Sequence, residues 1–121
     1  MTWKDAFSQG REIIFTTSSL TGRPNSVVVI SQGFVDGKLL VAACQMGRTL
    51  KNLEENPLVC AVGIRKKEYY RINGRARLSA SGKYFRAVVE RNDGPGVPSV
   101  KKAIAVSVKE VYDLDKVRKI L

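Results

Sequence analysis

Residues 36–65 read DGKLLVAACQMGRTLKNLEENPLVCAVGIR, and their order decides what kind of sheet this chain can form. An Asp-Gly pair at 36–37 supplies the positive φ angles of a tight hairpin, so the apolar segment 39–44 is expected to be a strand. Helix-forming residues follow from 47 to 56, and the Asn56-Pro57 pair ends that helix. A second apolar segment, 58–65, then predicts another strand.

Strand-like segments continue on both sides of this stretch. Six strands are predicted in all: 12–18, 26–31, 39–44, 58–65, 69–79 and 103–112. The run Val27–Ile30 is apolar at every position, which is typical of a strand covered on both faces. Asn73-Gly74 indicates a bulge or bend within the fifth strand.

Helical segments lie between and around the predicted strands. Thr2 and Asp5 have capping-box spacing and open a short helix that carries Trp3, Ala6 and Phe7. Ser81 is the expected cap of a longer helix whose core face would be Tyr84, Phe85, Val88 and Val89. An irregular loop rich in Gly and Pro is expected at 92–99, and a short basic helix from about Asp115.

These elements predict a mainly β (α+β) fold. The strands do not alternate with helices, which argues against a Rossmann-type parallel sheet. Adjacent short strands in a small chain tend to close into a barrel, because closure removes exposed edges. With 121 residues the chain holds a single domain, 1–121, large enough for a core without disulfide or metal staples.

Composition indicates a globular protein and an expected cytoplasmic location. Hydrophobic residues make up 44% and charged residues 26% of the chain. No apolar run approaches the roughly 20 residues of a membrane span, and the first residues lack the layout of a signal peptide. Cys44 and Cys60 are therefore expected to be reduced thiols.

The sequence contains no histidine, which excludes several kinds of chemistry. Ser-His and Cys-His nucleophilic systems, the commonest general acid–base residue and haem held by a proximal histidine are all removed. No metal site is predicted either, because the two cysteines form no CxxC pair. No catalytic side chain is predicted, and an enzyme built on this chain would need a cofactor to bring the reactivity.

Positive charge points to an anionic partner. Lysine and arginine number 21 against 11 acidic residues, giving a net charge of +10. Residues 65–77 hold six of the basic residues together with two tyrosines, a composition that could bind single-stranded nucleic acid by stacking and phosphate contacts. The start of the helix at Arg48-Thr49 offers a second possibility, since free N–H groups there favour a phosphate.

The chain resembles the FMN-binding split-barrel family, which includes pyridoxamine 5'-phosphate oxidase and small FMN-binding proteins. The matching motifs are Thr17-Ser18-Ser19-Leu20, Gly22-Arg23-Pro24, Val27-Val28-Val29, Asp36-Gly37-Lys38-Leu39, the stretch 47–59 that contains Asn52-Leu53-Glu54-Glu55-Asn56-Pro57, and Tyr70–Ala76. The resemblance implies a six-stranded antiparallel split β-barrel with peripheral helices. It also implies a homodimer that binds FMN.

The resemblance also implies which residues hold the flavin. The isoalloxazine ring and ribityl chain would contact Val28, Val29, Ala43, Cys44, Gln45 and Met46, in part through main-chain groups. The phosphate would face Arg48, Thr49, Lys51 and Asn52, and the partner chain would cover the ring with Pro98 and Val100. Many family members have a lysine where this chain has Thr49, which leaves open the side chain that holds the phosphate.

The activity expected from this resemblance is that of an FMN-dependent oxidoreductase or electron carrier. Its donor would be a reduced nicotinamide or another protein. Nothing in the sequence supplies the pyridoxal phosphate site of the full-length oxidase. A relative that binds the deazaflavin F420, with its polyanionic tail, stays open because of the positive charge, and nucleic-acid binding without catalysis is the competing class.

Overall fold

The first two strands of the chain pair antiparallel. In the computed structural model, which describes residues 2–92 and 94–121, β1 (Glu12–Ser18) buries Ile13, Phe15 and Thr17 on one face. It pairs antiparallel with β2 (Pro24–Val35) and, on its other edge, with β4 (Leu58–Arg65). β1 thus joins two hairpins that are far apart in sequence.

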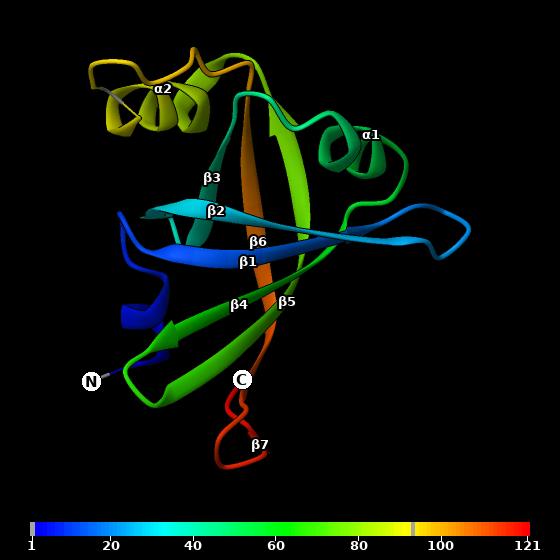
Figure 1. Ribbon diagram of the computed structural model, residues 1–121, viewed down its shortest axis with the longest axis vertical. Coiled ribbons are helices and arrows are strands. Elements are labelled where there is room, and N and C mark those ends of the chain that lie inside the picture. The colour runs from blue at the N-terminus through cyan, green and yellow to red at the C-terminus, as the bar shows by residue number, and fades with distance from the viewer. Residues whose placement is uncertain (1, 93) are drawn as a thin grey trace.

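The remaining strands close the sheet into a barrel. β3 (Lys38–Ala43) follows β2 through the predicted turn, in which Asp36 and Gly37 have φ of 53° and 75°. β5 (Glu68–Ser79) pairs with β4 and with β6 (Lys102–Asp113). The strand order is β3-β2-β1-β4-β5-β6, and pairing of β3 with β6 completes the circle (Figure 1). The predicted six-stranded antiparallel barrel is confirmed.

The barrel interior is the main hydrophobic core. Its buried side chains come from all six strands and from the N-terminal helix, and include Phe7, Phe15, Leu39, Ile72 and Ile104. A smaller cluster lies outside the barrel, where Val88 packs against Leu40, Ala103 and Ala105. This second cluster fixes a helix to the outer side of β3 and β6.

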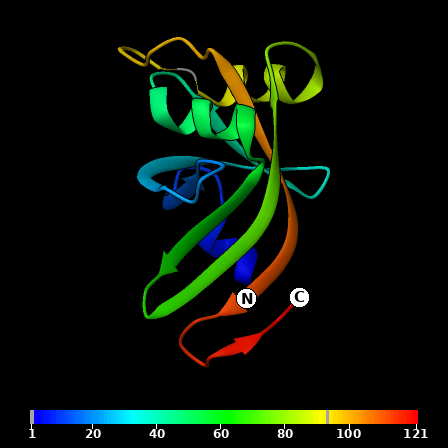
Figure 2. The ribbon, with the colours of Figure 1, turned by 90° about the vertical axis from the view of Figure 1, so that its right-hand side faces the viewer.

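Three helices lie at the periphery. η1 (Trp3–Phe7) is a 3₁₀ helix in which the Thr2 N–H donates to the Asp5 carboxylate at 3.2 Å, as the capping-box spacing predicted. α1 (Gly47–Glu55) and α2 (Gly82–Arg91) lie at the same end of the molecule and on opposite sides of it (Figures 1 and 2). Sites at that end therefore have a helix start on either side.

Two local predictions are wrong. The segment after Asp113 is not a helix: it turns, with the Lys116 N–H bonded to the Asp113 carboxylate at 2.9 Å, and returns as β7 (Arg118–Lys119) on the edge of β6. β7 adds a seventh strand outside the barrel. Val89 is 44% exposed and not on the core face of α2, because its neighbour Val88 occupies the contact with the sheet.

The apolar run in β2 is covered on one face only. Val27 and Val29 face the core, whereas Val28 and Ile30 are exposed on the outer side of the sheet. The expectation of a strand covered on both faces is therefore not met by this chain alone.

The bulge at Asn73-Gly74 is present, as a register shift between β5 and β6. Within residues 2–92 and 94–121, no helix is long and apolar enough to cross a membrane.

Close packing of η1 on β4 leads to a first prediction. A Cβ at Gly63 would lie 2.8 Å from the Ala6 carbonyl oxygen and 2.9 Å from Phe7 Cζ. Gly63→Ala should therefore displace η1 and lower the free energy of unfolding by about 1–3 kcal/mol, measured by urea denaturation at fixed protein concentration. Gly47→Ala is the control, since a Cβ there meets no atom within 4 Å. Equal stabilities of the two variants would contradict this packing.

Candidate functional site

α1 is fastened to the barrel by two polar contacts at buried side chains. Asn52 Nδ2 donates to Thr17 Oγ1 of β1 at 3.0 Å, and Asn25 Nδ2 of β2 donates to Thr49 Oγ1 at 3.4 Å. Thr49, Asn52 and Thr17 are all buried. These contacts fix how the helix lies on the barrel, with Arg48 and Asn52 beside the β1–β2 turn.

A polar pocket of about 240 Å³ lies at that place. It is lined by Ser19, Arg23, Pro24, Asn25, Arg48 and Asn52. Arg23 is held by its turn, where its N–H donates to Ser19 Oγ at 3.0 Å. No carboxylate lines this pocket among the described residues, and α1 has no acidic residue in its first turn. Two guanidinium groups and a helix N-terminus favour a phosphate or similar anion.

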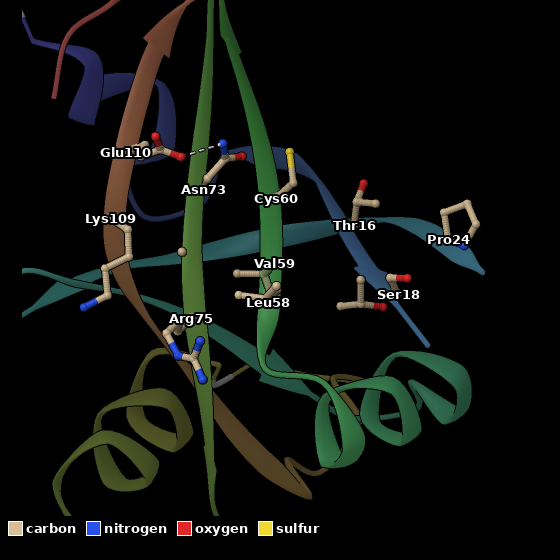
Figure 3. A pocket seen from close by; sticks show the side chains of 12 residues that line it. Thr16, Ser18, Pro24, Leu58, Val59, Cys60, Asn73, Arg75, Lys109 and Glu110 are labelled. Carbon is tan, nitrogen blue, oxygen red and sulfur yellow. Dashed lines mark hydrogen bonds between the residues drawn. The ribbon is translucent and has the colours of Figure 1, made fainter. Parts of the chain in front are cut away.

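A larger, more apolar groove of about 600 Å³ adjoins the polar pocket, because Pro24 lines both. It crosses the outer side of the sheet, and its other lining residues are Thr16, Thr17, Ser18, Leu58, Val59, Cys60, Asn73, Gly74, Arg75, Lys109 and Glu110. Figure 3 shows Arg75 at the end nearest the two helices and the Asn73–Glu110 pair farther along the strands. The polar pocket thus forms a positively charged end, and the groove continues from it as a more apolar surface.

Glu110 is held as an anion at the far end of the groove. Asn73 Nδ2 donates to Glu110 Oε1 at 3.3 Å, and the Tyr112 hydroxyl donates to Oε2 at 3.0 Å. These bonds, with Lys119 at 3.5 Å, lower the pKa of Glu110 below its ordinary value. Both carboxylate oxygens of Glu110 are therefore bonded within the chain at this end of the groove.

An apolar face runs beside the groove on β2, β1 and β4. We define it by its exposed side chains, Ile14, Val28, Ile30, Leu58 and Ile64. Ile14 of β1 pairs with Val28 of β2 and with Val62 of β4, so exposed apolar side chains lie on three adjacent strands. Val28, at 66%, is the most exposed of them. Such a face usually marks a contact with a ligand or another chain.

The residues predicted to contact a ring fall into two groups. Val28 lies on the apolar face, whereas the side chains of Val29 and Ala43 are buried in the core. Cys44 is half-buried, Gln45 is exposed, and Met46 packs against the core just before α1. Val29 and Ala43 could therefore contact a ligand only through their main-chain atoms.

The residues predicted to hold a phosphate are also divided. Arg48 and Asn52 line the polar pocket together, Thr49 is buried behind it, and Lys51 is exposed and does not line it. Sequence reasoning missed Ser19, Arg23 and Asn25 as site residues. Ser19 lies in the matching motif 17–20, and Arg23 and Asn25 lie in the predicted turn, but their proximity to α1 depends on the pairing of β1 with β2.

Pro98 and Val100 lie on a segment that folds back onto its own chain. The Cys44 thiol and Asn92 Nδ2 both donate to the Pro98 carbonyl, at 3.6 and 3.4 Å, and the Lys101 N–H donates to the Ala43 carbonyl at 2.9 Å. Pro98 is exposed, and Val100 packs in part against the cluster under α2. The segment therefore covers the end of β3.

The groove also contains a thiol whose protonation can be tested. Burial raises the pKa of Cys60 above its ordinary value, and the positive charge of Arg71 opposes that rise. In a Cys44→Ser background, the alkylation rate of Cys60 by iodoacetamide should rise with pH through a midpoint above that of a free cysteine. Arg71→Gln should move the midpoint further up, whereas Lys66→Gln in the β4–β5 turn should not. A midpoint at or below that of free cysteine would contradict the stated environment.

Known proteins with similar sequences agree with this architecture. The sequence profile of the family described as pyridoxamine 5'-phosphate oxidase matches residues 3–115. An uncharacterised protein of Methanocaldococcus jannaschii is 32% identical over 110 residues, which cover 85% of this chain and 73% of that protein.

Solved structures show the same fold at lower identity. HupZ of Group A Streptococcus has a TM-score of 0.84 at 21% identity, covering 98% of this chain and 95% of its own. An FMN-binding protein of Syntrophomonas wolfei has a TM-score of 0.70 at 18% identity, with coverages of 94% and 82%. At these identities the likeness concerns the fold alone.

The ligands named for proteins of this fold differ. An F420 reductase matches with a TM-score of 0.71 at 16% identity, covering 92% of this chain and 96% of its own. HutZ of Vibrio cholerae, described as a heme storage protein, has a TM-score of 0.66 at 12% identity, with coverages of 91% and 90%. The match of the family profile to nearly the whole chain nevertheless decides the family: this chain belongs to the pyridoxamine 5'-phosphate oxidase family.

Proposed function

We propose that this protein binds FMN and acts as a flavin-dependent oxidoreductase or electron carrier. The observation that carries the proposal is the polar pocket beside α1, which is lined by Arg23 and Arg48 and lies at the start of β2, the strand that carries the exposed Val28. A flavin mononucleotide has the matching shape, with a dianionic phosphate at one end and an aromatic ring at the other.

In this proposal the chain's residues bind and orient the cofactor. Arg23, Arg48 and Ser19 hold the phosphate together with the N–H groups at the start of α1, and Thr49 and Asn52 keep that helix in position. Lys51 adds positive charge from the solvent side. Val28 contacts the ring with its side chain, and main-chain groups of Val29 and of residues 43–46 meet the ring and ribityl chain. FMN, when bound, supplies the hydride or electron transfer.

The proposal includes a homodimer. A ring on the open outer side of a single barrel would leave apolar surface in water, and the apolar face beside it is itself exposed. A second copy on this face would cover both, with Pro98 and Val100 of one chain over the ring of the other. The free cysteines Cys44 and Cys60 are compatible with the cytoplasmic location that we propose. The donor we propose is a reduced nicotinamide or another protein.

Two alternatives differ in their support. F420 is favoured by the positive charge of the chain and by the fold it shares with an F420 reductase. Binding of single-stranded nucleic acid through 65–77 has less support: Arg71 stacks on the Tyr112 ring at 4.6 Å, and the Tyr70 hydroxyl donates to Glu68 at 3.1 Å. Those groups are engaged within the chain, so fewer are open for stacking on bases.

The phosphate pocket can be tested with a pair of ligands that differ only in the phosphate. Arg23→Ala with Arg48→Ala should weaken FMN binding about tenfold or more and leave riboflavin nearly unchanged, because each charge-assisted hydrogen bond contributes roughly 1.5–3 kcal/mol. Fluorescence titration measures both affinities. Lys66→Ala with Lys67→Ala is the control with the same loss of charge. Equal losses for FMN and riboflavin would place the phosphate elsewhere, and binding of F420 without FMN would favour the first alternative.

The dimer can be tested by placing a charge on the apolar face. Val28→Glu should convert a dimer into a monomer, because an unpaired carboxylate buried between two chains costs several kcal/mol. Light scattering measures the mass, and circular dichroism checks that the barrel is intact. Val89→Glu, an exposed valine on α2, is the control and should leave the dimer unchanged. A wild-type chain that stays monomeric with flavin bound would refute this part of the proposal.

A further inference from the structure

A second basic pocket lies on the other side of the barrel end, under the start of α2. This α2 pocket has a volume of about 400 Å³ and is lined by Lys38, Arg77, Ser79, Ser81, Lys83, Tyr84, Ala105 and Ser107. None of these residues lines the polar pocket beside α1 or the groove that adjoins it. The family likeness assigns no role to these residues.

The α2 pocket carries an excess of positive charge. Lys38, Arg77 and Lys83 come from three different elements, β3, β5 and α2, and converge on it. Asp36 on the rim is the single carboxylate that pairs with them in the described chain: it lies 2.6 Å from Lys83 Nζ and accepts a bond from the Tyr84 hydroxyl at 3.3 Å. Three cations against one carboxylate leave a net charge of about +2.

Hydrogen-bond donors line the same pocket. The Ser79 hydroxyl is buried and has no hydrogen-bond partner in the part of the chain described. The Ser107 hydroxyl accepts from Lys38 Nζ at 3.0 Å, so its own proton can be donated. Ser81 is the N-cap residue of α2, but its side chain makes no cap bond, and the first turn of α2 has no acidic residue. The N–H groups at the start of α2 are therefore open towards an anion.

The shape of the α2 pocket is set by the packing of α2 on the sheet and by the contacts of Asp36. Ala105 is 4% exposed and belongs to the cluster that holds α2 against β3 and β6. Its small side chain leaves the space that a larger residue would fill. Asp36 holds both Lys83 and Tyr84, which limits their motion. The cations are thus arranged around a defined space, in contrast to the isolated lysines of the β4–β5 turn.

We propose that the α2 pocket binds the phosphate group of a phosphorylated small molecule. A phosphate monoester carries close to two negative charges at neutral pH, which matches the net charge of the pocket, and it accepts several hydrogen bonds. The volume exceeds what a phosphate needs, so the pocket has room for the organic part of the molecule. This inference does not depend on FMN binding at the other pocket.

Amide NMR spectra of the protein, recorded with and without added FMN, test this site. Ribose 5-phosphate and inorganic phosphate are titrated in separate arms. Saturable shifts are expected at Gly82, Lys83 and Ser107 with ribose 5-phosphate. Lys38→Gln with Arg77→Gln should weaken this binding about tenfold or more, a loss of about 1.4 kcal/mol per tenfold. Lys66→Gln with Lys67→Gln, which removes the same charge elsewhere, should leave the affinity nearly unchanged.

Several outcomes would overturn the proposal. Shifts confined to the start of α1 would place the anion in the other pocket, and equal weakening by the control variant would indicate attraction to net charge only. Saturation with inorganic phosphate but not with ribose 5-phosphate would mean that the pocket takes a free anion and not an ester. Flavin absorbance separates the two proposals: Lys38→Gln with Arg77→Gln should keep the flavin, and a failure of FMN binding leaves the titration of the α2 pocket interpretable.

Discussion

Pairing of β3 with β6 is the constraint on which the rest of the structure depends. Six residue pairs, from Lys38–Ser107 to Ala43–Lys102, join the third strand of the chain to the last strand of the barrel. Without them the sheet would have two open edges and its inner side chains would lack a common interior. The same pairs bring Lys38 next to β6, and they fix the end of β3 from which the chain enters α1. Both basic pockets are therefore consequences of closure.

Buried polar groups then give α1 its direction. A helix held only by apolar contacts could rotate or slide, because such contacts are not directional. Asn52 and Thr49 instead bond to Thr17 and Asn25, which lie on neighbouring strands. An amide or hydroxyl buried without its partner costs free energy, so the correct orientation is favoured over its neighbours. The resemblance assigned both residues to phosphate binding, and their contacts indicate that they also position the helix that presents Arg48.

The strands could be predicted from sequence because their signals are local. Asp36-Gly37 marks a turn by its backbone preference, and the β-branched and aromatic residues of 13–17 mark a strand within a few positions. Arg23 could not be assigned to the site in this way, since it meets Arg48 only after β1 and β2 pair and α1 packs on them. The end of the chain was mispredicted for a related reason: an open edge of β6 offers hydrogen bonds to Arg118 and Lys119 that no local helix pattern reveals. The α2 pocket likewise depends on three elements that only closure brings together.

The two pockets that we propose to bind anions would also explain how a net charge of +10 can serve specific binding. Uniformly spread charge attracts every anion weakly and is screened over about 8–10 Å at physiological salt. Here guanidinium and ammonium groups are paired with directional donors at two helix starts, on opposite sides of the same end of the barrel. In these two proposals each pocket selects its anion by geometry, while the remaining lysines raise the local concentration of anions around both. Because the pockets share no lining residue, the charge of one can change without altering the direct contacts in the other.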